Sequence, residues 1–288
     1  MNNHKTIRLI METNLLPQVP DSLGNILNML LEPCDYDMNS CINMFESNSD
    51  LETVLMNALN YTLTKAHNIE NAKDAIIFLG AMNTRTVTIA FITRLLLPDS
   101  KGRTKVFDSQ TYWKHSIGTS IACHMIAEKT GLSDKNKLFT YGLIHDIGIT
   151  VLDICLPDHL DKLHELHDKG IHQIAAEKIV LGGITHADIG LWLCQEWGLP
   201  NEISEVVGYH HAPALAVDNK TEVEIMHLAD SISANYYERL LGNESTFIYS
   251  AKIAASLGLD NDFINEVAKK LPSEIYKLSK TINFLTTA

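Results

Sequence analysis

Residues 143 to 150 read LIHDIGIT, and they place His145 and Asp146 side by side within an apolar segment. The leucine and the isoleucines around the pair are typical of a buried helix, which predicts that both polar side chains lie in the interior of the fold. Burying an imidazole beside a carboxylate is unfavourable unless something pairs with them. The stretch therefore indicates either a buried hydrogen-bonded network or a site for a bound ion.

The composition of the chain limits its class. Its 288 residues, 45% of them hydrophobic and 20% charged, suffice for one large or two modest globular domains with a sizeable core. A net charge of -12 argues against broad electrostatic binding to nucleic acid or anionic membranes. No apolar run approaches the roughly 18 residues that span a bilayer, and the N-terminus lacks a signal-type apolar core. We therefore expect a cytoplasmic protein without a nucleic-acid or membrane partner.

Helical periodicity recurs along the whole chain and hairpin signals are missing, which predicts an all-α fold. We expect a layered multi-helix array with four parts: an N-terminal helical lobe at 1–98, a linker at 99–107, a lobe with the paired histidines at 108–243, and a C-terminal helical extension at 244–288. The expected helices lie at 21–33, 37–47, 49–60, 71–80, 84–98, 108–131, 134–146, 156–168, 171–181, 185–197, 201–211, 221–241, 245–257 and 260–282.

Five places put histidine or aspartate where the helical pattern predicts the interior. They are His115, the pair His145 and Asp146, His186, the pair His210 and His211, and Asp230. Small residues on the helix of His115 leave space around its ring, and Thr185 is expected to cap the helix that begins at His186. Taken singly, each residue has a structural explanation, such as a hydrogen bond, a helix cap or an ion pair. Jointly, five imidazoles and two carboxylates in one lobe predict a metal site.

Imidazole and carboxylate together suit iron, manganese or zinc better than calcium or magnesium alone. An adjacent His-Asp pair can serve two ions, because the carboxylate can bridge while the imidazole binds one of them. Two ions roughly 3.5 to 4 Å apart could activate a water and hold a phosphate. We therefore predict a divalent metal cofactor of two ions, with iron or manganese ahead of zinc, nickel or magnesium, and a nucleotide or other phosphate-containing ligand. Of the histidines outside the predicted set, six are expected on solvated faces (His4, His124, His159, His164, His167 and His172), and His227 lies three residues before Asp230.

The order of these residues resembles the HD superfamily of metal-dependent phosphohydrolases. From about Leu15 to Pro213 the chain is similar to an HDOD domain, through the segments YWKHS, YGLIHDIG, GGITHADIG, EWGLP and VVGYHHAP. The resemblance implies an HD-type array after an N-terminal helical lobe, and a role in bacterial signalling with a protein partner. The residue set also matches the ligand pattern of the related HD-GYP phosphodiesterases, which hydrolyse cyclic di-GMP. That match implies that Asp146 bridges the metals and that the other six residues complete their shells.

The chain departs from the HD-GYP pattern in two ways. Ile149 stands where those proteins carry a lysine that contacts phosphate, so a donor for developing negative charge is missing. The His pair continues as HHAPALAVDNK, without the Gly-Tyr-Pro motif. We therefore expect a regulatory HDOD protein that retains a metal site. This expectation does not require that the site catalyses a reaction. One alternative is an active phosphohydrolase on a nucleotide or cyclic nucleotide, in which Asp146 is the catalytic bridge. The other is a helical scaffold whose His and Asp residues form only a core network.

Overall fold

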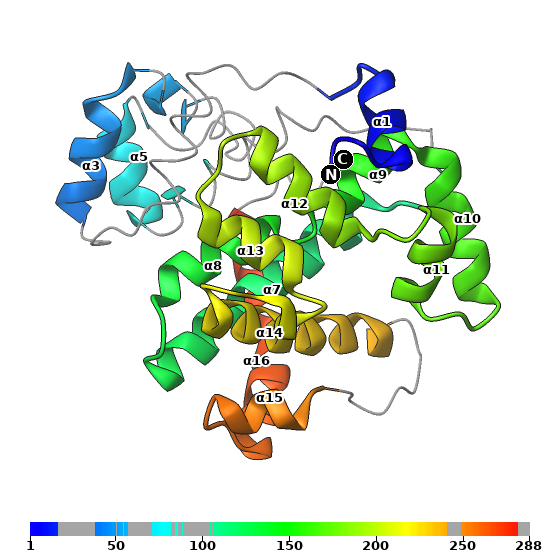
Figure 1. Cartoon of the computed structure of the whole chain (residues 1–288). Helices are drawn as coiled ribbons and strands as arrows, with labels where there is room; N and C mark the ends of the chain where they lie inside the picture. Colours follow the sequence, from blue (N-terminus) through cyan, green and yellow to red (C-terminus); the bar gives the residue numbers. More distant parts are fainter. Residues whose placement is uncertain are drawn as a thin grey trace.

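The described part of the chain is helical throughout. The computed structural model describes residues 1–16, 38–49, 51–53, 55–56, 69, 71–81, 84–85, 88, 104, 106–240 and 249–281. Their elements are α1 (Lys5–Glu12), α3 (Met38–Glu46), α5 (Ala72–Leu79), α7 (Ser109–Thr130), α8 (Lys135–Ile144), α9 (Ile147–Cys155), α10 (Pro157–Asp168), α11 (Gln173–Val180), α12 (His186–Glu196), α13 (Asn201–Tyr209), η1 (Pro213–Leu215), α14 (Lys220–Leu240), α15 (Ala251–Ser256) and α16 (Asn261–Thr281). The expected all-α fold is confirmed (Figure 1).

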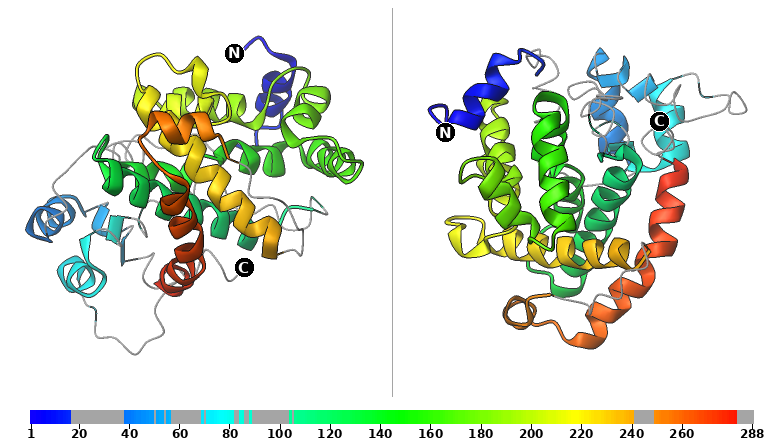
Figure 2. Two further views of the ribbon diagram at one scale, coloured as in Figure 1. Left: turned by 90° about the horizontal axis from the view of Figure 1, so that it is seen from below. Right: turned by 90° about the vertical axis from the view of Figure 1, so that its right-hand side faces the viewer.

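Helix α7 is the central element and packs against α8, α14 and α16. Asp108 begins it, because its carboxylate accepts hydrogen bonds from the backbone N–H groups of Gln110 and Thr111. Gly131 ends it in the left-handed conformation at φ 65°, where glycine is favoured. Figure 2 shows α14 running across the ends of neighbouring helices, with α16 along one side. This crossing arrangement makes a layered array rather than a simple bundle.

Two glycines allow helices to approach closely next to the histidines. A Cβ on Gly148 of α9 would lie 1.9 Å from the carbonyl oxygen of His186, so only glycine lets α9 contact the start of α12. On α7, a Cβ on Gly118 would lie 2.5 Å from Oγ of Ser233 on α14. The small residues beside His115 thus admit a neighbouring helix, whereas the sequence suggested free space around the ring.

Two helices differ from the expectations. The chain turns at His145 and Asp146 and forms the separate helix α9, where the sequence analysis assigned no helix. Helix α1 was also missed; it buries Ile7 and Ile10 completely, and Oγ1 of Thr6 donates a 2.6 Å hydrogen bond to the carbonyl of Leu181. The expected helices at 37–47 and 71–80 are confirmed as α3 and α5. The expected helix at 21–33 and most of those at 49–60 and 84–98 lie outside the described residues.

The segment Lys135–Cys155, which spans α8 and α9, is long and apolar enough by length and average composition alone to cross a membrane, although polar residues interrupt it. In the structure 89% of its apolar window is buried against the other helices. Its apolar surface therefore serves the core around His145 and Asp146, as core helices of this composition commonly do.

Candidate metal centre

The fold brings together all seven residues proposed from the sequence. They come from five parts of the chain: α7 supplies His115, the turn between α8 and α9 supplies His145 and Asp146, the first position of α12 supplies His186, the end of α13 supplies His210 and His211, and α14 supplies Asp230. The expected cap at Thr185 is confirmed, because its side chain and that of Asp188 form a capping box that fixes the start of α12.

Asp146 lies at the centre of the cluster. Its Oδ1 is 3.2 Å from Nε2 of His186 and 3.4 Å from Nε2 of His210. Its Oδ2 is 3.3 Å from Nε2 of His145 and 3.4 Å from Nε2 of His115. Each carboxylate oxygen therefore faces its own pair of imidazoles, which is the arrangement of a bridging ligand.

The donor atoms form two overlapping groups that share this aspartate. One group holds Asp146, His186, His210 and His211, the other holds His115, His145 and Asp146, and the donor atoms within each lie within 4.8 Å of one another. Outside both groups, Asp230 lies 3.1 Å from Nε2 of His115 through Oδ1 and 3.7 Å from Nδ1 of His211 through Oδ2. The second carboxylate thus lies beside both groups.

Two of the buried histidines are held in one orientation by backbone carbonyls. Nδ1 of His145 is 2.9 Å from the carbonyl oxygen of Gly142, and Nδ1 of His210 is 2.7 Å from that of Val207. A carbonyl only accepts, so Nδ1 carries the proton and donates, which in the neutral ring leaves the lone pair on Nε2. Both Nε2 atoms are fully buried, make no hydrogen bond, and face Asp146.

His186 is held by a residue that the sequence analysis missed, Glu177 of α11. The Glu177 carboxylate is 2.7 and 2.8 Å from Nδ1 of His186, and it accepts a 2.9 Å hydrogen bond from the His186 backbone N–H. Burial would raise the pKa of Glu177, but the charge of His186 and these hydrogen bonds lower it. The sequence does contain a sign of this role. Glu177 lies three residues before the apolar Val180 in AAEKIV, and this spacing places both on one side of the helix.

The electrostatics of the cluster couple its acids to its imidazoles. Burial would raise the pKa of Asp146, but the charge of His145 and contacts with neighbouring imidazoles lower it well below its usual range. Burial opposes a charged His145, and the charge of Asp146 outweighs it and raises that pKa to about 10. Burial and the charge of His210 lower the pKa of His211 to about 2. Without a metal, the cluster therefore keeps protons on some imidazoles and excludes them from others.

These donors fit a divalent metal. Two ligands bound to one ion at about 2.1 Å lie about 3.0 to 3.4 Å apart, depending on the coordination geometry. Asp146 makes four contacts of 3.2 to 3.4 Å with imidazole nitrogens. A buried nitrogen without a hydrogen bond costs about 1 to 3 kcal/mol, and the cluster holds two such atoms aimed at its centre. Because the two nitrogens face different oxygens of Asp146, each would be a ligand of a separate ion.

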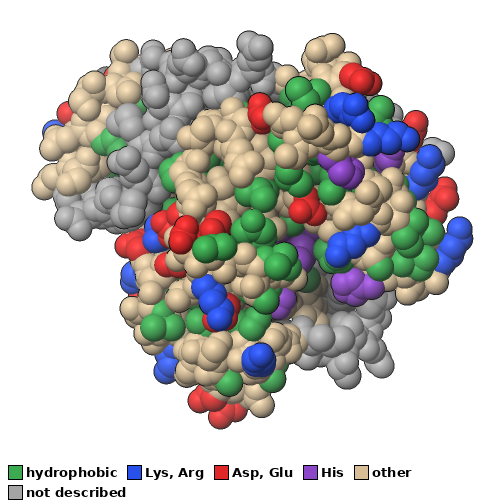
Figure 3. Space-filling view, in the orientation of Figure 1, with side chains coloured by type: hydrophobic (Ala, Val, Ile, Leu, Met, Phe, Trp, Pro, Cys, Tyr) green, Lys and Arg blue, Asp and Glu red, His purple; other side chains and the backbone are tan. Residues whose placement is uncertain are grey.

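Several histidines that the structure describes lie outside the cluster. His164 is half exposed and lies 3.6 Å from Asp168, in agreement with a solvated face. His124 contradicts that expectation, because it is half-buried and its ring packs edge-on against Phe139. His227 lies behind the centre, where its Nδ1 is 2.7 Å from the carbonyl of His210. Figure 3 shows further histidine side chains on the surface of the half that carries α10 and α11, mixed with charged residues of both signs.

Known proteins share this architecture. The sequence model of the HDOD domain matches residues 16–213. A solved structure from Marinobacter aquaeolei VT8, named as a signal transduction protein, is 20% identical in sequence with a TM-score of 0.74. The match covers 96% of this chain and 61% of the other. A second solved structure, from Shewanella amazonensis SB2B and named as a phosphohydrolase, is 20% identical with a TM-score of 0.67. This match covers 99% of this chain and 100% of the other. These likenesses show the fold.

A curated relative extends further than this chain. An uncharacterised protein of Treponema pallidum (strain Nichols) is 21% identical over 203 residues. The match takes in 68% of the present chain but only 37% of the length of the relative.

Proposed function

Because the chain belongs to the HDOD family, we propose that it is a regulatory protein of bacterial signal transduction that holds a divalent metal centre. The single observation that carries the metal is Asp146, whose two oxygens face separate pairs of imidazoles. We assign it as the bridge between two ions. The other ligands in this proposal would be His115, His145, His186, His210, His211 and Asp230. Iron and manganese suit this mixed nitrogen and oxygen donor set, ahead of zinc, nickel or magnesium.

Elemental analysis tests this assignment. Protein purified without chelator is expected to contain one to two ions per chain, and Asp146→Asn to lose most of them, because the amide has no charge and only one oxygen. Asp168→Asn is the matched control, since Asp168 is exposed on α10 and lies away from the centre. A wild-type protein with less than roughly 0.2 ions per chain, and no gain on adding iron or manganese, contradicts the proposal and favours a purely structural network.

A second candidate, a metal-dependent phosphohydrolase acting on a nucleotide or cyclic nucleotide, draws on the same bridging geometry. Bound ions would supply Lewis acidity toward water and phosphate. The chain itself would orient the imidazoles through Gly142, Val207 and Glu177. Ile149 offers no charge to a phosphate at the position where HD-GYP relatives carry lysine, so we rank this activity second. A screen of nucleotides and cyclic dinucleotides with several metals tests it, and turnover that survives Asp146→Asn contradicts this mechanism.

A further inference from the structure

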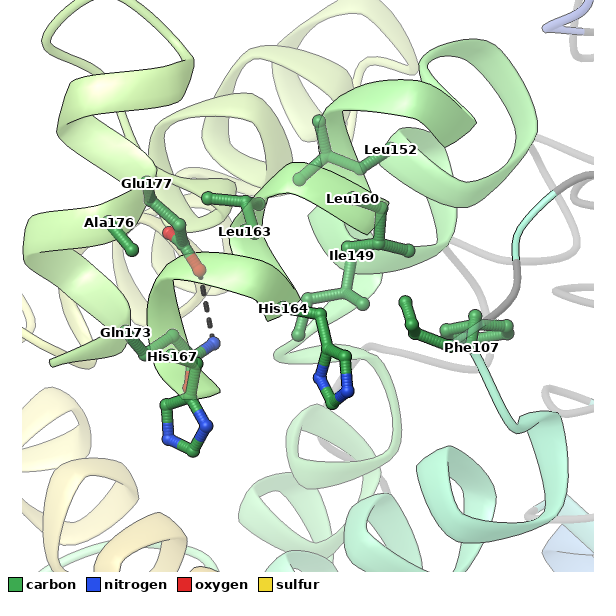
Figure 4. A pocket seen from close by; sticks show the side chains of 11 residues that line it. Phe107, Ile149, Leu152, Leu160, Leu163, His164, His167, Gln173, Ala176 and Glu177 are labelled. Carbon is green, nitrogen blue, oxygen red and sulfur yellow. Dashed lines mark hydrogen bonds between the residues drawn. The ribbon is translucent and has the colours of Figure 1, made fainter. Parts of the chain in front are cut away.

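A cavity of about 270 Å³ lies next to the candidate metal centre and is lined by residues of α9, α10 and α11. Two of its lining residues connect it to that centre. Glu177 lines the cavity and holds His186, and Ile149 lines it three residues after Asp146. Figure 4 shows both side chains directed into the same space. Ligand sites commonly measure about 300 to 1,000 Å³, so this cavity suits a small molecule.

The described lining of the cavity is mostly apolar and suits an uncharged ligand. Leu152, Leu160 and Leu163 give it aliphatic walls, and the ring of Phe107 stands at one end (Figure 4). Among the described residues that line the cavity there is no lysine or arginine to pair with a phosphate or carboxylate. The one charged group in this lining is the carboxylate of Glu177, which repels anions. The described lining therefore favours an uncharged ligand over a phosphate-containing one.

The polar groups of the cavity favour a ligand that donates hydrogen bonds. Oε1 of Glu177 accepts a 3.0 Å hydrogen bond from Nε2 of Gln173, the bond drawn in Figure 4. Gln173 is exposed, so its side chain can swing away and leave that oxygen to a ligand N–H. The imidazoles of His164 and His167 lie along one edge of the space, on the exposed side of α10 (Figure 4). Flat aliphatic and aromatic walls with a single strong acceptor suit a planar ring.

We propose that this cavity binds a small, uncharged aromatic heterocycle through a ring N–H that donates to Glu177, and that its occupancy is coupled to the metal centre through His186. The coupling to the metal centre rests on the proposed metal function. Binding of the heterocycle in the cavity does not depend on that function. An ion held by Nε2 of His186 would restrict the imidazole and, through its Nδ1, the Glu177 carboxylate. The Glu177 side chain would then lose less conformational entropy when a ligand binds to it. By reciprocity, the ligand tightens metal binding by the same factor.

Benzimidazole and N-methylbenzimidazole are the probes, because they share the same planar ring system and only the first has a ring N–H. Calorimetry on metal-free and metal-loaded protein measures both. Benzimidazole is expected to bind the metal-free protein at least about fivefold more tightly than the methylated probe, since loss of one hydrogen bond to a charged group costs that much or more. Loaded protein should bind benzimidazole at least about fivefold more tightly still, within the range of measured allosteric couplings.

A pair of variants locates the binding. Leu160→Phe fills the cavity, whereas Leu166→Phe makes the same change on the same helix, at a half-buried residue outside the lining. Benzimidazole affinity is expected to fall at least about tenfold in Leu160→Phe, since a filled cavity excludes the ring, and to stay within about twofold in Leu166→Phe.

Three results would overturn the proposal. The first is no binding of benzimidazole to the wild-type protein. The second is equal binding of the two probes to the wild-type protein, a comparison that does not depend on whether a variant folds. The third is an equal effect of Leu160→Phe and Leu166→Phe. Equal affinity in metal-free and loaded protein would overturn the coupling alone. If the chain holds no metal, the measurements on metal-free protein still test binding in the cavity. Failure of the metal proposal can therefore be told apart from failure of the cavity proposal.

Discussion

Replacement of Glu177 by glutamine is expected to weaken metal binding without unfolding the protein. The carboxylate accepts hydrogen bonds from Nδ1 and the backbone N–H of His186 and from Nε2 of Gln173, and it is 2% exposed. Glutamine keeps the size but removes the charge that orients the ring and raises the basicity of Nε2. Loss of such an outer carboxylate costs about 10- to 100-fold in metal affinity, or about 1.4 to 2.7 kcal/mol.

The measurement is a chelator-competition titration of metal-free protein with manganese and with zinc. Gln173→Ala separates the parts of the network, because it removes only the third hydrogen bond and should change affinity by less than about threefold. Glu165→Gln, an exposed change on α10, is the control for altered net charge. The reasoning is refuted if Glu177→Gln binds metal within about threefold of the wild-type protein while its circular dichroism and thermal unfolding stay unchanged.

Two further predictions concern pH and packing. Because Asp146 raises the pKa of His145 to about 10 in the metal-free protein, that proton must leave before an ion binds, so metal affinity should rise from about pH 6 to about pH 9. Calorimetry in buffers of different ionisation enthalpy measures the released protons, and a pH-independent affinity would count against the assignment. Gly148→Ala should destabilise the fold by about 3 kcal/mol or more, because its Cβ would meet the carbonyl of His186 at 1.9 Å. Urea unfolding measures this, and a loss below about 1 kcal/mol would contradict the close contact.

Sequence reasoning reached the cluster because its members carry local signals. His145 and Asp146 interrupt an apolar segment, Asp230 lies among buried helix residues, and Thr185 marks the helix start at His186. Such periodicity also predicts the all-α class. The residues alone predict that the cluster members meet in one lobe, and the resemblance adds the role of Asp146 as the bridge, because helix spacing does not determine how five separated parts of the chain converge.

The missed features depend on contacts between separate elements. Glu177 reaches His186 only because the chain returns between α11 and α12, and its own helix signals nothing more than a buried acid. Helix α9 was missed because the apolar run through LIHDIGIT hides the turn at His145 and Asp146. Helix α1 was missed although its eight residues have a clear apolar side, because so short a segment is stable as a helix only when the completed fold buries that side.

The choice between a metal centre and a structural core network depends on how the polar atoms are satisfied. A core network retains buried imidazoles by pairing both ring nitrogens, since each unpaired one costs about 1 to 3 kcal/mol. Here the Nδ1 atoms of His145 and His210 are paired with carbonyls, whereas both Nε2 atoms are left without a hydrogen bond. They face the same carboxylate, which already contacts His115 and His186. The carboxylate of Asp146 thus has an imidazole nitrogen at 3.2 to 3.4 Å on four sides, and two cations held by these imidazoles would satisfy the buried nitrogens that the protein leaves without a hydrogen bond.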